Sequence, residues 1–167
     1  MHKNTPRLAF VVMSVAGSLI ALAAPVNAAT NQLSGTGFFN PSKGHPCPVD
    51  QPAYSSYDPI VMTGSLDGCW YTHIETSKTT PGGVYLETGH ELFVGSLNGG
   101  PTGTFTTNYN FEAKLNAAGK EVRGGCQHRI VATSGTVGLA GATGIVFFMD
   151  IVGVTITYKY HGHISLS

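Results

Sequence analysis

The chain has 167 residues, with 9 basic and 9 acidic side chains, and only 11% of its residues are charged. No cluster of basic residues could neutralise a run of phosphates, so the composition argues against a nucleic-acid partner. The 22 glycines and 42% hydrophobic residues exclude a disordered chain and are typical of a β-protein with many tight turns.

The first 28 residues have the layout of a secretory signal peptide. Lys3 and Arg7 form a basic start, an apolar run follows, and Val26-Asn27-Ala28 supplies the small residues of a cleavage site. A membrane anchor is the competing interpretation, but the run is shorter than the roughly 20 apolar residues of a spanning helix. We therefore expect cleavage near Ala28. The product would be a secreted protein, extracellular or in the cell envelope, with a single domain over 29–167 and no membrane span.

The part of the chain after residue 28 alternates strand-forming runs with turns. Five prolines make 40–59 a loop, which we expect to cover one end of the fold. Asp67-Gly68 is typical of a tight hairpin turn, and Gly89 and Gly124-Gly125 are typical of bulges. The only helical candidate is a short turn within Val137–Ala142. Eight strands are predicted, over 32–39, 60–66, 69–77, 84–95, 104–115, 121–132, 144–151 and 154–166.

Three cysteines lie in this part of the chain, at Cys47, Cys69 and Cys126. In an oxidising compartment they would form one disulfide and leave one thiol. The sequence leaves the pairing open among the three. We expect the remaining thiol to be buried and inert, while a reactive thiol and a link to another chain are the alternatives.

Two of the predicted strands alternate strictly between apolar and polar residues, which favours strands with one buried face. Their apolar side chains could line a ligand cavity, fill a core or cover a subunit interface. The candidates for a ligand cavity are Phe105, Tyr109, Phe111, Ile156, Tyr158 and Tyr160.

The number of strands and their short connections predict an all-β fold, an eight-stranded antiparallel up-and-down barrel. Closing the sheet into a barrel removes the unpaired edges that promote aggregation. A barrel of this size can be filled by side chains or can hold one small ligand. A β-sandwich is the alternative, because the same alternation of residues serves both folds.

Two stretches near the C-terminus, TSGTVGLAGATGIVFFMD and ITYKYHGHISL, resemble the C-terminal signature of the allene oxide cyclase-like β-barrel superfamily, which in turn resembles the dirigent proteins. The sequence departs from this signature at Val137, where the signature has a second glycine. The resemblance implies an eight-stranded barrel, a homotrimer, and a small secreted bacterial protein without an assigned activity. No catalytic residue of the cyclases transfers to this sequence. The matching positions are Gly135, Thr136, Leu139, Gly141, Ala142, Gly144, Tyr158 and Tyr160.

Carboxylates within the predicted strands are candidates for acid–base catalysis, because burial inside a barrel would raise their pKa. Glu75 is the favoured catalytic candidate, since Tyr71 and His73 share its face of the strand. The carboxylates concerned are Glu75, Glu87, Glu91, Glu112 and Asp150.

Histidines provide two further candidate sites. His161 and His163 share one face of the last strand and could form half of a metal site, with His73, His90 or His128 as a third ligand. Two solvated histidines are the alternative interpretation. Cys126 and His128 could form a nucleophile pair, although a disulfide or packing role suits the cysteine better. The sequence predicts no cofactor.

Three functions remain open from the sequence. The first is binding of a small apolar ligand, or a scaffold role, by a secreted barrel. The second is an isomerase or cyclase that acts on an apolar substrate inside the barrel, and the third is a structural surface or interaction protein. A side-chain-filled barrel would exclude both ligand functions, whereas a cavity with convergent polar groups would favour the enzyme.

Overall fold

The computed structural model describes residues 29–39, 47 and 51–167. The predicted signal peptide, 1–28, lies outside the described residues, as do 40–46 and 48–50 of the proline-rich loop. Within the described part, no helix is long and apolar enough to cross a membrane.

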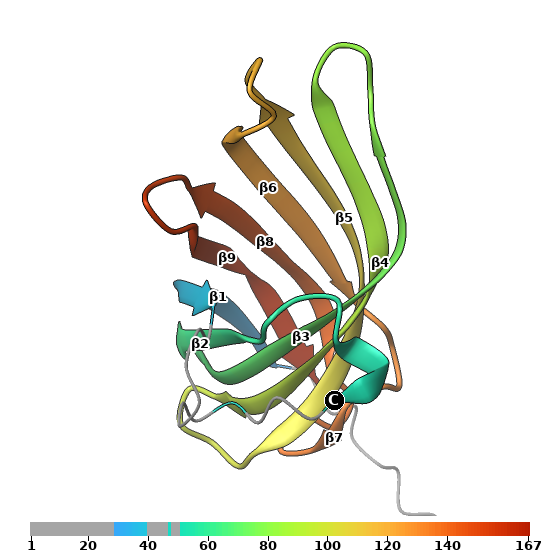
Figure 1. The fold of residues 1–167 in the computed structure, drawn as a ribbon. Coiled ribbons are helices and arrows are strands. Elements are labelled where there is room, and N and C mark those ends of the chain that lie inside the picture. Colours follow the sequence, from blue (N-terminus) through green and yellow to red (C-terminus); the bar gives the residue numbers. More distant parts are fainter. Residues whose placement is uncertain (1–28, 40–46, 48–50) are drawn as a thin grey trace, which may run out of the picture.

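Eight antiparallel strands close into one barrel (Figure 1). Each strand pairs with its neighbours in the sequence, and the last pairs with the first. The predicted up-and-down barrel is therefore confirmed, and the sandwich is excluded. The barrel strands are β1 (Ala29–Phe39), β2 (Ile60–Gly64), β3 (Leu66–Thr79), β4 (Val84–Leu97), β5 (Gly103–Leu115), β6 (Glu121–Ile130), β8 (Thr143–Ile151) and β9 (Thr157–Leu166).

Two short elements complete the described fold. The two residues of β7 (Thr136–Val137) pair with the start of β5 at one end of the barrel. The 3-10 turn η1 (Pro52–Tyr54) lies against β3. We call the end that carries β7 the closed end. The open end carries the β3–β4, β5–β6 and β8–β9 connections (Figure 1).

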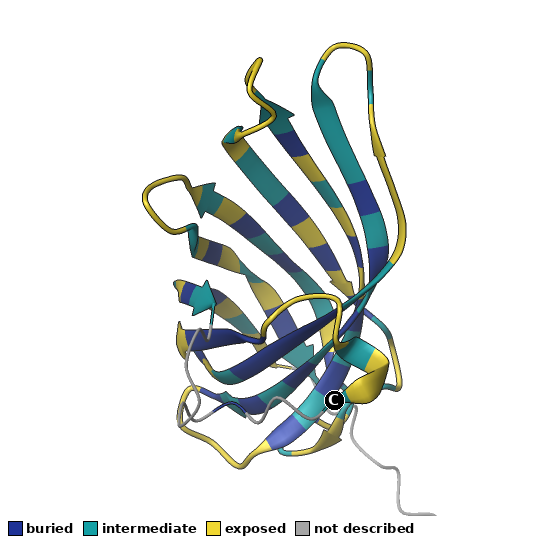
Figure 2. Cartoon of the chain, viewed as in Figure 1, coloured by how far each residue is buried: buried dark blue, intermediate teal, exposed yellow. Residues whose placement is uncertain are grey.

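The alternation of residues along β4 and β5 decides what faces the interior (Figure 2). In β5, Phe105, Thr107 and Tyr109 are buried, whereas Asn108 and Asn110 between and beyond them are exposed. Successive side chains of a strand point to opposite faces, so the apolar face predicted from the sequence is the inner face.

Aromatic side chains fill the closed end. Trp70, Phe93 and Phe105 are fully buried and in mutual contact, with ring centroids 5.0–5.8 Å apart. Leu139 and Ala142, from the turns after β7, are also fully buried in this cluster. Each such side chain contributes about 1.5–3 kcal/mol on burial, so this half of the barrel is a packed core.

The hairpin turn expected at Asp67-Gly68 lies instead at Gly64-Ser65, so that prediction is wrong. Gly64 has a φ of +111°, which favours glycine, and β3 begins at Leu66. Gly68 pairs with Gly95 inside the sheet, where a Cβ on Gly68 would lie 2.3 Å from the Val94 carbonyl oxygen. That glycine serves the close approach of two strands rather than a turn.

Other local predictions are displaced by one or a few residues. The bulge expected at Gly89 is on the facing strand, where Glu75 is the extra residue between Ile74 and Thr76. The bulge expected at Gly124-Gly125 lies at Val122. The segment after Val137 forms hydrogen-bonded turns and no helix.

A disulfide between Cys47 and Cys69 fastens the proline-rich loop to the outer face of β3. Val61 and Tyr71 are buried with the two cysteines in a small cluster on that face. Cys126 is a free, buried thiol. The expected pattern of one disulfide and one buried thiol is confirmed.

Candidate functional site

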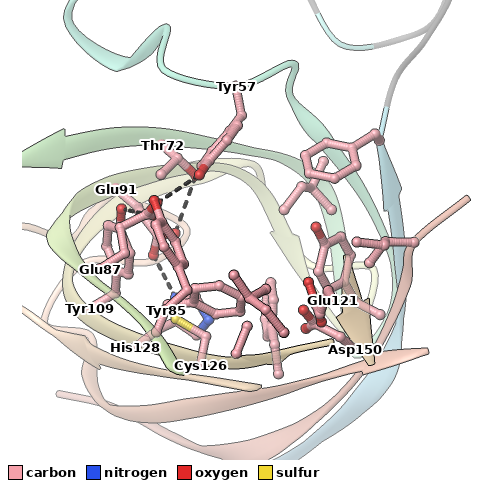
Figure 3. Close-up of a pocket in the computed structure, with 18 residues that line it drawn as sticks. Tyr57, Thr72, Tyr85, Glu87, Glu91, Tyr109, Glu121, Cys126, His128 and Asp150 are labelled. Atoms are coloured by element: carbon pink, nitrogen blue, oxygen red, sulfur yellow. Dashed lines mark hydrogen bonds and ion pairs between the residues drawn. The ribbon is translucent and has the colours of Figure 1, made fainter. Parts of the chain in front are cut away.

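A cavity of about 310 Å³ occupies the open half of the barrel (Figure 3). Residues from the strand ends at the open end of the barrel line the rim of the cavity. Most of its wall is aromatic or aliphatic, and several buried polar groups break this apolar surface. The main apolar lining residues are Phe39, Ile60, Phe111, Leu115, Phe148 and Ile156.

Glu87 on β4 points into the cavity and is held by three tyrosine hydroxyls. Tyr57 and Tyr85 donate to Oε2 at 2.7 and 2.6 Å, and Tyr109 donates to Oε1 at 2.7 Å. Burial, followed by the bond to Glu87, raises the pKa of Tyr57 and Tyr109 well above the usual range. The phenols therefore stay protonated and donate, and they satisfy a carboxylate that is only 3% exposed.

Glu91 lies four residues further along β4, on the same inner face, and forms a buried pair with His128 on β6. The distance from Nδ1 of His128 to Oε2 of Glu91 is 2.5 Å. Thr72 and Thr107 donate to the same carboxylate at 3.3 and 2.9 Å. Three donors thus surround Glu91, which places a proton on Nδ1 of the imidazole.

The second ring nitrogen of His128 is unpartnered. Nε2 is buried and has no hydrogen-bond partner among the described residues. The ring is 2% exposed and packs between Phe148 and Trp70, with centroids at 4.1 and 5.1 Å. With the proton on Nδ1, Nε2 of a neutral imidazole carries a lone pair. The Glu91–His128 pair therefore presents a hydrogen-bond acceptor or a base beside the cavity.

A pair of carboxyl groups lies across the cavity from His128, formed by Glu121 on β6 and Asp150 on β8 (Figure 3). Burial, followed by hydrogen bonding and charge repulsion from Glu121, raises the pKa of Asp150 to about 8. Asp150 is therefore protonated at neutral pH and can act as a donor or acid. The cavity thus combines a base on one side with an acid on the other.

Cys126 lines the same cavity, with its Sγ 3.9 Å from Nδ1 of His128. Burial raises the pKa of this thiol, and the nearby carboxylates Glu91 and Asp150 raise it further. Because the thiolate is the nucleophilic form, this environment opposes nucleophilic chemistry at Cys126.

The favoured catalytic trio of the sequence lies outside the cavity. Tyr71 is buried in the outer cluster beneath the proline-rich loop. His73 stacks on His90 of β4 with ring centroids 4.6 Å apart, and Glu75 binds the same His90 at 3.1 Å. The three residues share a face, as expected, but that face is the outer one.

Four of the six predicted cavity residues do line the cavity, namely Tyr109, Phe111, Ile156 and Tyr158. Phe105 belongs to the packed core of the closed end. The hydroxyl of Tyr160 accepts from the backbone N–H of Leu66 at 2.8 Å and so connects β9 to the start of β3.

The two histidines considered for a metal, His161 and His163, lie on the exposed side of β9. His161 stacks on Phe147, with ring centroids 5.3 Å apart. No cluster of three or more His, Cys, Asp or Glu residues in the described ranges is arranged to hold a metal ion.

Sequence reasoning included Glu87, Glu91 and Asp150 among its carboxylates but did not identify their partners. His128 was considered only as a partner for Cys126 or a metal. Tyr57 and Glu121 were missed, because they lie in the loop or next to a turn, where alternation carries no signal, and Tyr85 was missed although it lies within a predicted strand. The period-2 spacing of Tyr85, Glu87 and Glu91 is the signal that could have placed them on one face.

Comparisons of the chain with protein-family models, with curated proteins and with solved structures found no match.

Proposed function

We propose that the barrel binds one small, largely apolar and uncharged molecule in its cavity. The observation that carries this proposal is the cavity itself, about 310 Å³ with apolar walls and a few buried polar groups. Ligand sites have this composition and span roughly 300–1,000 Å³, so the occupant belongs at the small end of the range.

The charges inside the cavity favour a neutral occupant. Glu87 and Glu91 are buried carboxylates whose oxygens are already engaged by tyrosine, threonine and histidine donors. A ligand carboxylate would meet their like charge in a poorly hydrated space, which costs several kcal/mol. A ligand hydroxyl could instead donate to Nε2 of His128, and a ligand carbonyl oxygen could accept from the protonated Asp150 carboxyl.

Native mass spectrometry with matched probes tests the binding proposal. We expect medium-chain alcohols and ketones to bind one per barrel, and carboxylic acids of equal length to bind far less. Ala113→Trp would fill the cavity, because Ala113 is buried in its wall. Glu112→Trp, on the exposed side of the same strand, is the matched control. Equal retention of the probe by both folded variants would overturn the proposal, and so would a failure of every probe to bind.

An isomerase or cyclase is the second candidate function, and one observation favours it. The Glu91–His128 pair and the Asp150 carboxyl face the same cavity from different strands. His128 would remove a proton from a carbon next to a carbonyl group, and Asp150 would give a proton to the substrate at another position. Both side chains would then exchange protons with water and return to their starting states. The substrate's composition is unchanged, so no oxidant or co-reactant is needed. The resemblance to the allene oxide cyclase-like superfamily implies a trimer, whereas a cyclase activity does not follow from it.

Proton exchange followed by NMR in deuterated water tests this second function. The probe is a β,γ-unsaturated ketone, whose α-protons exchange faster when a base is supplied. We expect exchange above the buffer rate, its loss in His128→Gln, and its retention in His161→Gln, a control on the outer face. If the protein exchanges the probe no faster than buffer, or if His128→Gln exchanges it as fast as the unmodified protein, the enzyme proposal fails.

Secretion belongs to the same proposal. The Cys47–Cys69 disulfide supports an oxidising, extracellular location. Sequencing the N-terminus of protein recovered from the producing cell's exterior tests cleavage near Ala28. Sedimentation of that material tests the trimer.

A further inference from the structure

An apolar loop projects from the open end of the barrel, between β8 and β9. Its side chains include Val152, which is 41% exposed, and Val154, which is fully exposed, and Ile151 at the end of β8 is 39% exposed. Met149, on the outer face of β8 just before the loop, is 51% exposed. Apolar side chains gathered at the tip of one loop are unusual on a surface in contact only with water.

This loop is also one lip of the cavity. Ile156, two residues after Val154, lines the cavity wall, and Asp150 and Tyr158 do so on either side of the loop. The apolar surface therefore continues from the exposed tip into the cavity. A surface that covers the tip would also face the cavity mouth.

Basic residues concentrate at the same end. The described part of the chain contains six Lys and Arg residues, and only Arg129 lies toward the closed end. Among the described residues, the exposed carboxylates at the open end are Asp58 and Glu112, whereas Glu121 and Asp150 line the cavity. The basic residues of the open end are Lys78, Lys114, Lys120, Arg123 and Lys159.

We propose that the protein docks on an anionic lipid surface with its open end, inserting the tip of the β8–β9 loop between headgroups. The valines supply apolar area, and the surrounding basic residues attract the negative leaflet. The cavity mouth then faces the lipid, where small apolar molecules concentrate. Docking depends on the loop and its charges, and it does not depend on whether the cavity is occupied.

A second copy of the chain fits this surface less well. The apolar tip consists of a few side chains, far below the roughly 800 Å² per partner of a stable interface. A two-fold contact through the tip would also bring the basic residues of both copies together, which is unfavourable. A lipid surface of opposite charge has neither difficulty.

Vesicle co-sedimentation of the purified protein tests the proposal. The vesicles contain either phosphatidylcholine alone or equal parts of phosphatidylcholine and phosphatidylglycerol. We expect binding to the mixed vesicles that weakens with added salt, and a roughly tenfold loss for Val152→Asp/Val154→Asp. The matched control is Val137→Asp, because Val137 is 79% exposed at the closed end. The unmodified protein and its variants have the same N-terminal sequence. A difference in vesicle binding between them therefore comes from the substituted residues.

A charge variant and a measurement of size complete the test. Lys120→Glu/Arg123→Glu should reduce binding to mixed vesicles while unfolding at the same temperature as the unmodified protein. Equal binding by the loop variant and the Val137→Asp control would overturn the proposal, as would a lack of binding to mixed vesicles. A shift from oligomer to monomer in sedimentation of the loop variant, without loss of vesicle binding, would identify the tip as an interface between copies.

Discussion

Glu87 illustrates how single side chains let this barrel keep carboxylates among aromatic rings. Its two oxygens accept from three phenols on β4, β5 and the loop before β2. Such a group is stable only while its donors remain, because a buried carboxylate or phenol without a partner costs about 1–3 kcal/mol or more. The cluster joins the proline-rich loop to the barrel wall through Tyr57.

Glu87→Ala should therefore destabilise the protein. Removing the acceptor leaves the buried Tyr109 hydroxyl unpaired, and we expect a loss of about 2–4 kcal/mol in the free energy of unfolding. Urea denaturation followed by circular dichroism measures it. Tyr57→Phe is the control and should cost no more than about 1.5 kcal/mol, because Tyr57 is 41% exposed. Equal losses in both variants would contradict this account of the cluster.

Asp150 should make stability depend on pH in a recognisable direction. Its folded-state pKa of about 8 exceeds the roughly 4 of an unfolded chain. Between these values the folded protein binds a proton that the unfolded chain does not, so the free energy of unfolding falls as pH rises through this window. Asp150→Asn stays neutral and lacks this contribution.

Thermal unfolding at about pH 5 and about pH 9 measures the effect. We expect Asp150→Asn to gain stability relative to the unmodified protein as pH rises. Glu112→Gln, which removes an exposed carboxylate on β5, should follow the unmodified protein. A constant difference between Asp150→Asn and the unmodified protein across this range would show that Asp150 is ionised throughout.

The sequence predicts which residues share a face but not which face lies inside. Glu75, Tyr71 and His73 were grouped correctly, yet Tyr71 is buried on the outer face, in the cluster that contains Cys47 and Cys69. Burial of an outer face by residues distant in the sequence leaves no local pattern. The partnership of Glu91 with His128 is equally invisible, because it joins residues 37 positions apart through strand pairings.

At the scale of elements, all eight barrel strands were predicted, since alternation and β-branched residues act over whole segments. The errors concern connections. Asp67-Gly68 has the composition of a turn, but pairing of Leu66 with Leu97 and of Gly68 with Gly95 extends β3 through it. Gly68 is locally acceptable both in a turn and within a strand, and its pairing with β4 places it in the strand.

The disulfide is the element-scale feature with the clearest expected effect on stability. Cys47 and Cys69 are 22 positions apart, and closing a loop of that length contributes about 3 kcal/mol. Cys47→Ser/Cys69→Ser should lose about that amount in urea denaturation. The unmodified protein should lose a similar amount when a reductant is added, whereas the double variant should not respond. A response of the double variant to reductant would place the effect at Cys126.

At the scale of the whole molecule, the pairing of β1 with β9 closes the barrel. Ala29 is the register partner of Leu166, so the first described strand begins where the last one ends. This is the pairing with the greatest separation along the chain, and it closes the sheet into a barrel.

The chain could therefore begin at a different strand while the order of the strands around the barrel stays the same. A circular permutant that joins Ser167 to Ala29 by a short linker, with new ends in the exposed β5–β6 turn between Ala117 and Ala118, should fold to the same barrel. Cooperative urea unfolding with an unchanged circular dichroism spectrum would support it. A non-cooperative transition would mean that closure requires the original strand order.

The packing of Trp70 has an optical consequence. It is the single tryptophan of the chain, it is fully buried, and its ring lies 5.1 Å from those of His128 and Phe148 at the base of the cavity. All tryptophan emission therefore originates beside the His128 imidazole, in apolar surroundings that shift the emission to short wavelength. Trp70 contacts two residues that line the cavity, so titration of an unlabelled compound into the proposed ligand cavity can be followed by intrinsic emission alone.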